Sequence, residues 1–144
     1  MIDIYPQIYK GLKAELDKFS QSESVLLNKR KISFHNSFIR SSQAFPCVVI
    51  EEKANMNSEG EMDFVEKSSS LMYEVNVYDD GKKKNETCRA IAKAIDGYMA
   101  GRLGFSRINM ESFPNLADST IERYLLRYEG YIDNETGNIS RTKY

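Results

Sequence analysis

The chain has 144 residues, a formal net charge of −1 and two cysteines. A chain of this length forms one domain of common size and buries a hydrophobic core without needing disulfides or metal ions. The near-neutral charge argues against a protein built mainly to hold nucleic acid, because such domains carry a large cationic excess that neutralises phosphates. The sequence therefore predicts a single domain, and any contact with DNA is expected to be incidental.

The first predicted element is a helix over residues 5–19. Pro6 is tolerated at a first helical position, and one apolar stripe follows, made of Ile8, Leu12, Leu16 and Phe19. This stripe predicts that the helix lies on a sheet. Residues 20–43 are mostly polar, and their short apolar pieces at 25–27 and 32–34 are compatible with either a partial strand or a packed loop.

Two strands follow, separated by an acidic stretch. Residues 44–52 are β-branched and apolar, which predicts a mostly buried strand. Residues 69–78 alternate between an apolar face with Leu71, Tyr73, Val75 and Val77 and a mixed face with Met72, Glu74, Asn76 and Tyr78. An inserted acidic loop is expected at about 52–68, because this stretch is long, rich in Asp and Glu, and without apolar periodicity. A surface excursion without any partner is the alternative.

The second half of the chain predicts a helix and two more strands. A turn at 79–81 precedes a helix from about residue 85 to 103, which ends at Gly104 as its C-cap and carries the stripe Cys88, Ile91, Ala92, Ile95, Met99 and Leu103. Residues 105–113 alternate as a strand, with Phe105, Arg107, Asn109 and Glu111 on one side. Residues 120–133, TIERYLLRYEGYID, form the last strand, whose core face is predicted to carry Tyr124, Leu126, Tyr128 and Ile132.

These elements predict an α+β fold, with a single mostly antiparallel sheet of about four strands and two helices packed on one face. Residues 1–133 make up the domain, and residues 134–144 are expected to form a C-terminal arm or a short hairpin. The other face of the sheet has no obvious cover in the sequence.

The odd-numbered residues of the last strand are expected to lie on that uncovered face. They interleave three apolar and three charged side chains, namely Ile121, Arg123, Leu125, Arg127, Glu129 and Tyr131. Such a face is too apolar for solvent and too charged for an interior. Arg and Tyr are enriched at interface cores, which favours a protein partner over a plain solvated face. Internal cross-strand pairing of the arginines with Glu51 and Glu74 is the alternative.

The sequence contains no recognisable catalytic or metal-binding pattern. The single histidine, His35, has no cysteine or carboxylate at ligand spacing, and Cys47 and Cys88 lie in apolar patterns typical of buried, reduced thiols. Lys82–Lys84 precede a helix and are placed to meet phosphate, although a solvated charge run is the commoner outcome. We therefore expect no catalytic residue, no metal and no cofactor. The N-terminus has no signal-peptide pattern and no apolar run is long enough to span a bilayer, so a soluble protein that is not exported is expected.

Taken in chain order, several phrases resemble the tail terminator, or tail completion, proteins of long-tailed bacteriophages. They are FPCVVIEEKANM, LMYEVNVYDDGK, IAKAIDGYM, LGFSRINM and PNLADSTIERYLLRYEGYID. The most specific parts are the succession YEVNVYDDGK then IAKAID, and the closing PNLADSTIERYLLRYEG. The resemblance covers nearly the whole domain, from the first helix to Asp133, and is poor over residues 20–43.

The resemblance implies a non-enzymatic structural protein of the virion. Such a protein forms a ring, commonly hexameric, that caps the tail tube, ends tail elongation and joins the tail to the head connector. Its implied partners are further copies of itself, the tail tube protein and the head–tail connector protein, with no membrane and with DNA only passing through the lumen. Its implied location is the head-proximal end of the virion tail, after assembly in the host cytoplasm.

A ring subunit needs surfaces for its neighbours, which gives the uncovered face and the acidic stretch expected roles. The residues expected to contact a neighbouring subunit are Ile121, Arg123, Leu125, Arg127 and Tyr131. Those expected to contact the tail tube or line the lumen are Glu59, Glu61 and Asp63. Two rivals stay open: a cytosolic ferredoxin-like α+β regulatory or small-molecule-binding module, and a small enzyme that uses His35.

Overall fold

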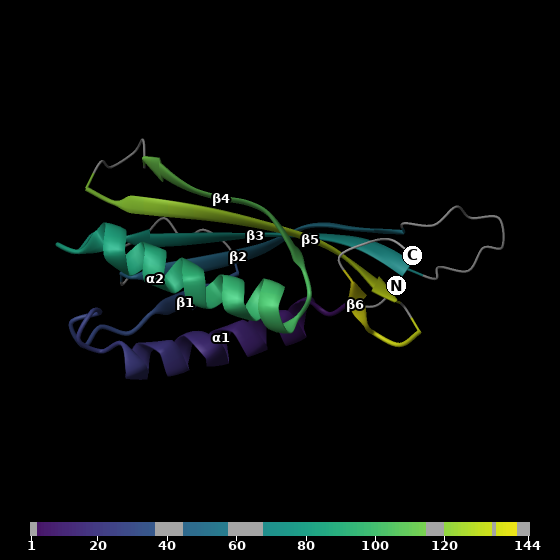
Figure 1. Cartoon of the computed structure of the whole chain (residues 1–144), viewed down its shortest axis with the longest axis horizontal. Helices are drawn as coiled ribbons and strands as arrows, with labels where there is room; N and C mark the ends of the chain where they lie inside the picture. The colour runs from purple at the N-terminus through teal and green to yellow at the C-terminus, as the bar shows by residue number, and fades with distance from the viewer. Residues whose placement is uncertain (1–2, 37–44, 58–67, 115–119, 134, 141–144) are drawn as a thin grey trace.

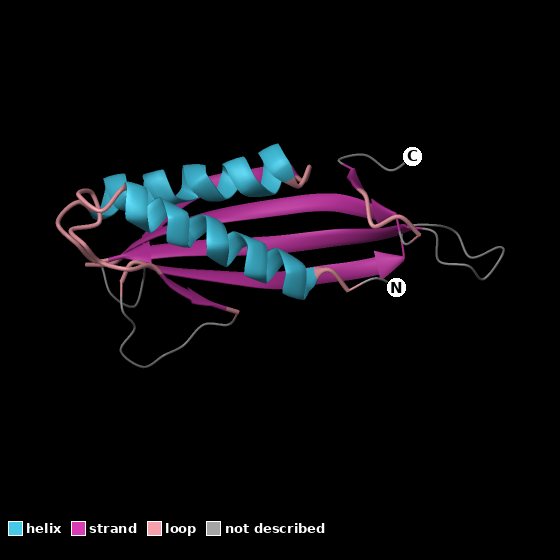
Figure 2. Cartoon of the chain, turned by 90° about the horizontal axis from the view of Figure 1, so that it is seen from below, coloured by secondary structure: helices cyan, strands magenta, loops and turns pink. Residues whose placement is uncertain are grey.

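The structure is a computed structural model that describes residues 3–36, 45–57, 68–114, 120–133 and 135–140. Two helices lie side by side on one face of a single sheet (Figure 1, Figure 2), which confirms the predicted α+β class. The elements in chain order are α1 (Tyr5–Ser22), β1 (Ser33–His35), β2 (Cys47–Asn57), β3 (Ser68–Asp79), α2 (Lys84–Asp96), the π-helical turn η1 (Gly97–Arg102), β4 (Ser106–Pro114), β5 (Glu122–Asp133) and β6 (Ile139–Ser140).

The sheet has six strands in the order β1-β2-β3-β5-β4, with β6 paired to β5. β1 runs parallel to β2, whereas the other pairs are antiparallel. The prediction of a mostly antiparallel sheet therefore holds for every pairing except that of β1 with β2, and the predicted number of about four strands is too low. β1 has three residues and β6 two, so neither is long enough to show a period of two in the sequence.

The hairpin of β2 and β3 is longer than the sequence predicts. Residues 53–57, which the prediction assigned to the acidic loop, continue β2 as far as the pairing of Asn57 with Ser69. The register shifts between Glu52 and Ala54, so two residues of β2 oppose one of β3. This bulge interrupts the alternation of side chains, so residues 53–57 lack the regular period of two by which a strand is recognised in the sequence. The predicted contact residues Glu59, Glu61 and Asp63 lie outside the described residues.

One core lies between the sheet and the two helices. The helices contribute the predicted stripes, including Ile8, Leu12, Leu16, Cys88, Ile91, Ala92 and Ile95, and β3 and β5 contribute Leu71, Tyr73, Val75, Val77, Tyr124, Leu126, Tyr128 and Ile132. All of these side chains are buried, which confirms both helix stripes and the core faces predicted for the two strands. Each large apolar side chain buried in this way stabilises the fold by about 1.5–3 kcal/mol.

A second bulge corrects the prediction for β4. Arg107 pairs with Tyr128 and Asn109 pairs with Arg127, so Ile108 is skipped and remains 52% exposed. Beyond the bulge the faces exchange, because Met110 packs against the same core as Phe105. The strict alternation predicted for residues 105–113 is therefore wrong after Arg107.

The second helix ends as the sequence predicts, but through a different last turn. After α2, the turn η1 is π-helical. Gly104 then adopts a φ of 89°, in the left-handed region that glycine occupies without steric cost. The amide of Phe105 donates to the carbonyl of Met99 at 3.0 Å, which starts β4 directly beneath the helix end.

Candidate interaction surface

The candidate surface is the sheet face turned away from α1 and α2, here called the open face. Within the described residues, no helix covers this face (Figure 2). Strand pairing arranges its side chains in cross-strand rows on β2, β3 and β5, which are Cys47–Tyr78–Arg123, Val49–Asn76–Leu125, Glu51–Glu74–Arg127, Ala54–Met72–Glu129 and Met56–Ser70–Tyr131. The rows change in character from one end of the sheet to the other.

The first end of the open face is a small second core. Cys47 and Val49 are buried and Tyr78 is 8% exposed, while Phe45 and Ile121 pack partly buried against them. Burial raises the pKa of the Cys47 thiol to about 11, so this thiol stays protonated and inert near neutral pH. Ile121, predicted to meet a neighbouring subunit, therefore already has apolar contacts within its own chain.

The middle of the open face is a hydrogen-bonded polar network. The Arg127 Nε donates to Glu74 Oε2 at 3.2 Å, and the Asn76 Nδ2 donates to Glu74 Oε1 at 3.2 Å. The Arg123 Nε donates to Asn76 Oδ1 at 2.9 Å, and its guanidinium lies 5.9 Å from the centre of the Tyr78 ring. Each arginine donates its Nε–H to a short side chain of β3, and these hydrogen bonds hold both guanidinium groups on the sheet surface.

The network includes one of the two internal pairs that the sequence suggests. The predicted internal pair of Glu74 with an arginine is confirmed, since Glu74 lies opposite Arg127 in the strand register. Glu51 takes no arginine among the described residues and pairs instead with Lys53 at 3.0 Å. The Arg127 side chain remains 49% exposed despite its pair, and the described residues offer its two Nη groups no partner. Among the described residues, the Arg127 guanidinium is thus hydrogen-bonded through Nε, and its two Nη groups are available to another partner.

The last end of the open face carries an exposed methionine among half-buried apolar and polar side chains. Met56 is 61% exposed, and it shares a row with the half-buried Tyr131, beside Ala54 and Met72 in the next row. Sequence reasoning placed Met72 and Tyr131 on this face. It missed Met56, because the bulge at Lys53 hides the strand that carries it.

The remaining predicted residues are placed as follows. Leu125 is only 5% exposed, so it has little surface left for a neighbouring subunit. His35 lies half-buried on β1 opposite Val49. The described residues contain no group of three His, Cys, Asp or Glu side chains able to hold a metal ion. They also contain no helix long and apolar enough to cross a membrane.

Chemically, the open face offers recognition groups. Two anchored guanidinium groups, a tyrosine and one exposed methionine are side chains that bind carboxylates and apolar surface on another protein. Neither a scan against protein-family models nor a search of curated proteins finds a match for this chain.

Proposed function

We propose that the protein is a structural component of a bacteriophage tail, which assembles into a ring on the tail tube, ends tail elongation and joins the tail to the head connector. The observation that carries this proposal is the open face, with Arg127 anchored through Nε and its Nη groups without a hydrogen-bond partner among the described residues. The sequence phrases resembling tail terminators supply the kind of assembly. The open face supplies a surface on which copies can meet.

The expected free-energy changes distinguish an internal role of Arg127 from a role at an interface between subunits. A partly exposed cross-strand pair such as Arg127 with Glu74 contributes only about 0.2–1 kcal/mol to the stability of one chain. Removing one member of a buried, hydrogen-bonded charge pair at an interface costs about 2–5 kcal/mol. A substitution at Arg127 should therefore affect assembly far more than folding.

Glutamine is the substitution that tests this most cleanly. The sequence alone suggests Arg127→Glu, but a glutamate there would lie directly opposite the Glu74 carboxylate and destabilise the chain by repulsion. Arg127→Gln removes the charge and keeps a hydrogen-bond donor. Arg107→Gln is a matched control, because Arg107 is 45% exposed and pairs with Asp96 at 3.3 Å on the helix side of the sheet.

The experiment measures particle size by sedimentation and shape by negative-stain imaging, with and without purified tail tubes. The wild type and Arg107→Gln should form rings, free or on tube tips, whereas Arg127→Gln should stay a folded monomer with a nearly unchanged melting temperature. Normal rings from Arg127→Gln would contradict the interface assignment. A tight dimer of the wild type with a bound metabolite would instead favour a regulatory or small-molecule-binding module.

A further inference from the structure

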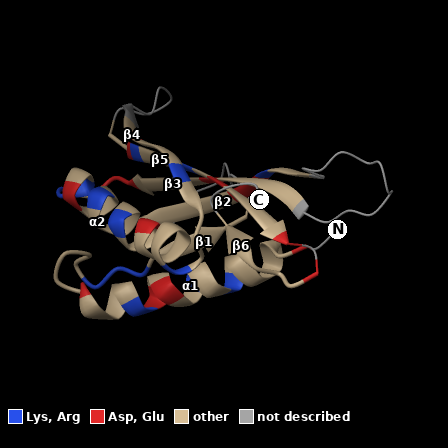
Figure 3. Ribbon diagram, turned by 45° about the vertical axis from the view of Figure 1, so that its right-hand side comes forward, with Lys and Arg blue, Asp and Glu red and all other residues tan. Residues whose placement is uncertain are grey.

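Lysine and arginine side chains from two distant segments meet at one end of the molecule, here called the basic end. Lys29, Arg30 and Lys31 come from the segment that follows α1, and Lys82 and Lys83 come from the turn before α2. Blue segments mark both in Figure 3, where the end of α1 lies near the start of α2. This meeting is not visible in the sequence, in which the two segments are separated by three strands.

Arg30 joins the two segments. Its Nη1 donates to Asp79 Oδ1 at 2.7 Å and its Nη2 to Asp79 Oδ2 at 3.3 Å, while its Nε donates to the carbonyl of Leu27 at 2.9 Å. The Asp79 side chain is fully buried, so this two-point pair holds a charge away from water. A Cβ at Gly81 would lie 3.0 Å from Arg30 Nη2, which shows how closely the turn approaches the arginine.

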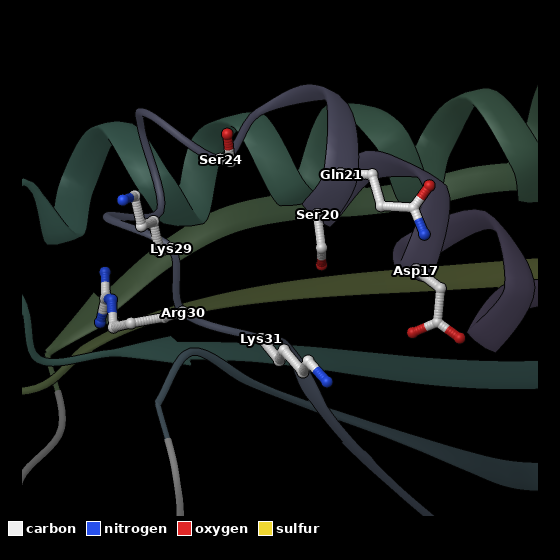
Figure 4. Close-up of a pocket in the computed structure, with 7 residues that line it drawn as sticks. All are labelled: Asp17, Ser20, Gln21, Ser24, Lys29, Arg30 and Lys31. Atoms are coloured by element: carbon white, nitrogen blue, oxygen red, sulfur yellow. The ribbon is translucent and has the colours of Figure 1, made fainter.

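A hollow flanks Arg30 on each side. One, of about 430 Å³, is lined by Lys29, Arg30 and Lys31 and by Asp17, Ser20, Gln21 and Ser24 at the end of α1 (Figure 4). The other, of about 480 Å³, is lined by Val25, Leu26, Asn28, Arg30, Gly81, Lys82 and Lys83. Both hollows are shallow and bordered by cations, and each also has polar side chains that donate hydrogen bonds.

The lysines of the basic end are free to bind. Lys29, Lys31, Lys82 and Lys83 are exposed. In the part of the chain that the structure describes, none of their four side-chain ammonium groups has an ion-pair or hydrogen-bond partner. Among the residues that line the two hollows, Asp17 is the one carboxylate. Asp80 is 4.0 Å from Arg30, which already faces Asp79. The cations therefore outnumber the carboxylates in the lining of the two hollows.

The side chains of the basic end favour one class of negatively charged partner over the others. Lysine is depleted at protein–protein interfaces but is a common contact of phosphate backbones. Neither hollow has an aromatic residue on which a base can stack. Val25 is 92% exposed beside the lysines, but one valine is too small an apolar face to enter a lipid layer.

We propose that the basic end binds the phosphate groups of a nucleic-acid backbone without reading its bases. The binding is weak and salt-sensitive, because it rests on exposed point charges. This goes beyond the proposed tail function and does not depend on it, since the basic end is formed by the loops at the helix ends and not by the open face. The low net charge of the chain is compatible with a local basic surface of this kind.

The test measures fluorescence anisotropy of a labelled mixed-sequence DNA duplex of about 20 base pairs against salt concentration. Neutralising four phosphates predicts a log–log salt slope of about −3.6, so affinity should fall about 100-fold between about 50 and 200 mM salt. Lys82→Gln/Lys83→Gln should reduce the steepness of the slope by about 2, and so should Lys29→Gln/Lys31→Gln. Lys10→Gln/Lys13→Gln on the exposed side of α1 changes the net charge equally and should leave the slope unchanged.

Three results would overturn the proposal. They are no binding of the duplex at about 50 mM salt, an equal loss of binding in the Lys10/Lys13 control, and tighter binding of vesicles rich in anionic lipid than of DNA. Two independent double variants are measured so that a folding defect in one of them does not decide the outcome. Circular dichroism checks that each variant is folded. Repeating the titration with Arg127→Gln separates this proposal from the previous one, because the basic end should bind DNA whether or not rings form.

Discussion

At the scale of single residues, Tyr5 shows how burial ties stability to pH. Its ring stacks on Tyr73 with centroids 6.1 Å apart, and its hydroxyl donates to the Ile50 carbonyl at 2.9 Å. Burial, with smaller contributions from Tyr9, Glu51 and Glu52, raises the pKa of Tyr5 to about 12. An unfolded tyrosine has a pKa of about 10. Between these two values the unfolded chain releases a proton that the folded chain retains.

The sign of the effect follows from this difference. The contribution of Tyr5 is fully present below about pH 10 and is lost as the pH rises toward 12, so the free energy of unfolding falls over that range. Tyr5→Phe loses the hydrogen bond to Ile50 and should be about 1 kcal/mol less stable at pH 7. It has no proton to release, so the stability gap to the wild type should shrink between pH 10 and 12. Urea unfolding at a series of pH values measures the gap, and a gap that stays constant would contradict the assigned pKa.

At the scale of elements, two glycines set how closely elements approach. A Cβ at Gly130 on β5 would lie 2.6 Å from the ring of Phe105, which is fully buried and held edge-on against Tyr73. A Cβ at Gly11 on α1 would lie 1.9 Å from the Tyr98 hydroxyl, the far end of a partly buried side chain. The first neighbour cannot move without disturbing the core, whereas the second is able to swing away.

The substitution Gly130→Ala should therefore destabilise the fold by about 1–3 kcal/mol through overpacking. Gly11→Ala should be much closer to neutral, because the shift of Tyr98 is offset by the gain of about 0.5–1 kcal/mol from replacing glycine inside a helix. Urea unfolding of the two variants gives the comparison. Equal losses for both would show that Phe105 is less constrained than its packing indicates.

Elements with regular periodicity could be predicted from the sequence, and elements with interruptions could not. The stripes of both helices and the alternation of residues 69–78 and 120–133 gave correct core faces, because unbroken periods of 3.6 and 2.0 survive in the folded chain. The bulges at Lys53 and Ile108 each reverse the alternation, which shortened one predicted strand and misassigned a face of another. For β1 the sequence left a partial strand and a packed loop as alternatives, because three residues contain no period.

The candidate surfaces were predictable to a similar degree. The mixed composition of the last strand correctly indicated an arginine-rich face and the pair of Arg127 with Glu74. It did not indicate that Leu125 is already covered by its own chain. The sequence indicated Lys82–Lys84 as a possible phosphate contact. It did not indicate that this segment lies beside Lys29 and Lys31, because the two segments are joined by the pairing of Arg30 with Asp79, which the sequence patterns do not predict.

At the scale of the whole molecule, the two proposed surfaces are built from different parts of the fold. The open face consists of strand residues on the side away from both helices, and the basic end consists of loop residues where α1 ends and α2 begins (Figure 1). A subunit in a closed ring uses some surfaces for identical neighbours and keeps others for different partners. The separation of these surfaces allows both kinds of contact in one assembled particle.

Hydroxyl-radical footprinting of assembled rings tests the central claim, that the open face is buried when copies of the chain meet. Met56 is 61% exposed in the single chain and shares a row with Tyr131 on the open face, whereas Met110 lies on the helix side of β4. Compared with the Arg127→Gln monomer, rings of the wild type should show slower oxidation of Met56 and Tyr131 and unchanged oxidation of Met110. Rings in which Met56 and Tyr131 react as fast as in the monomer, while Met110 is protected, would contradict the claim.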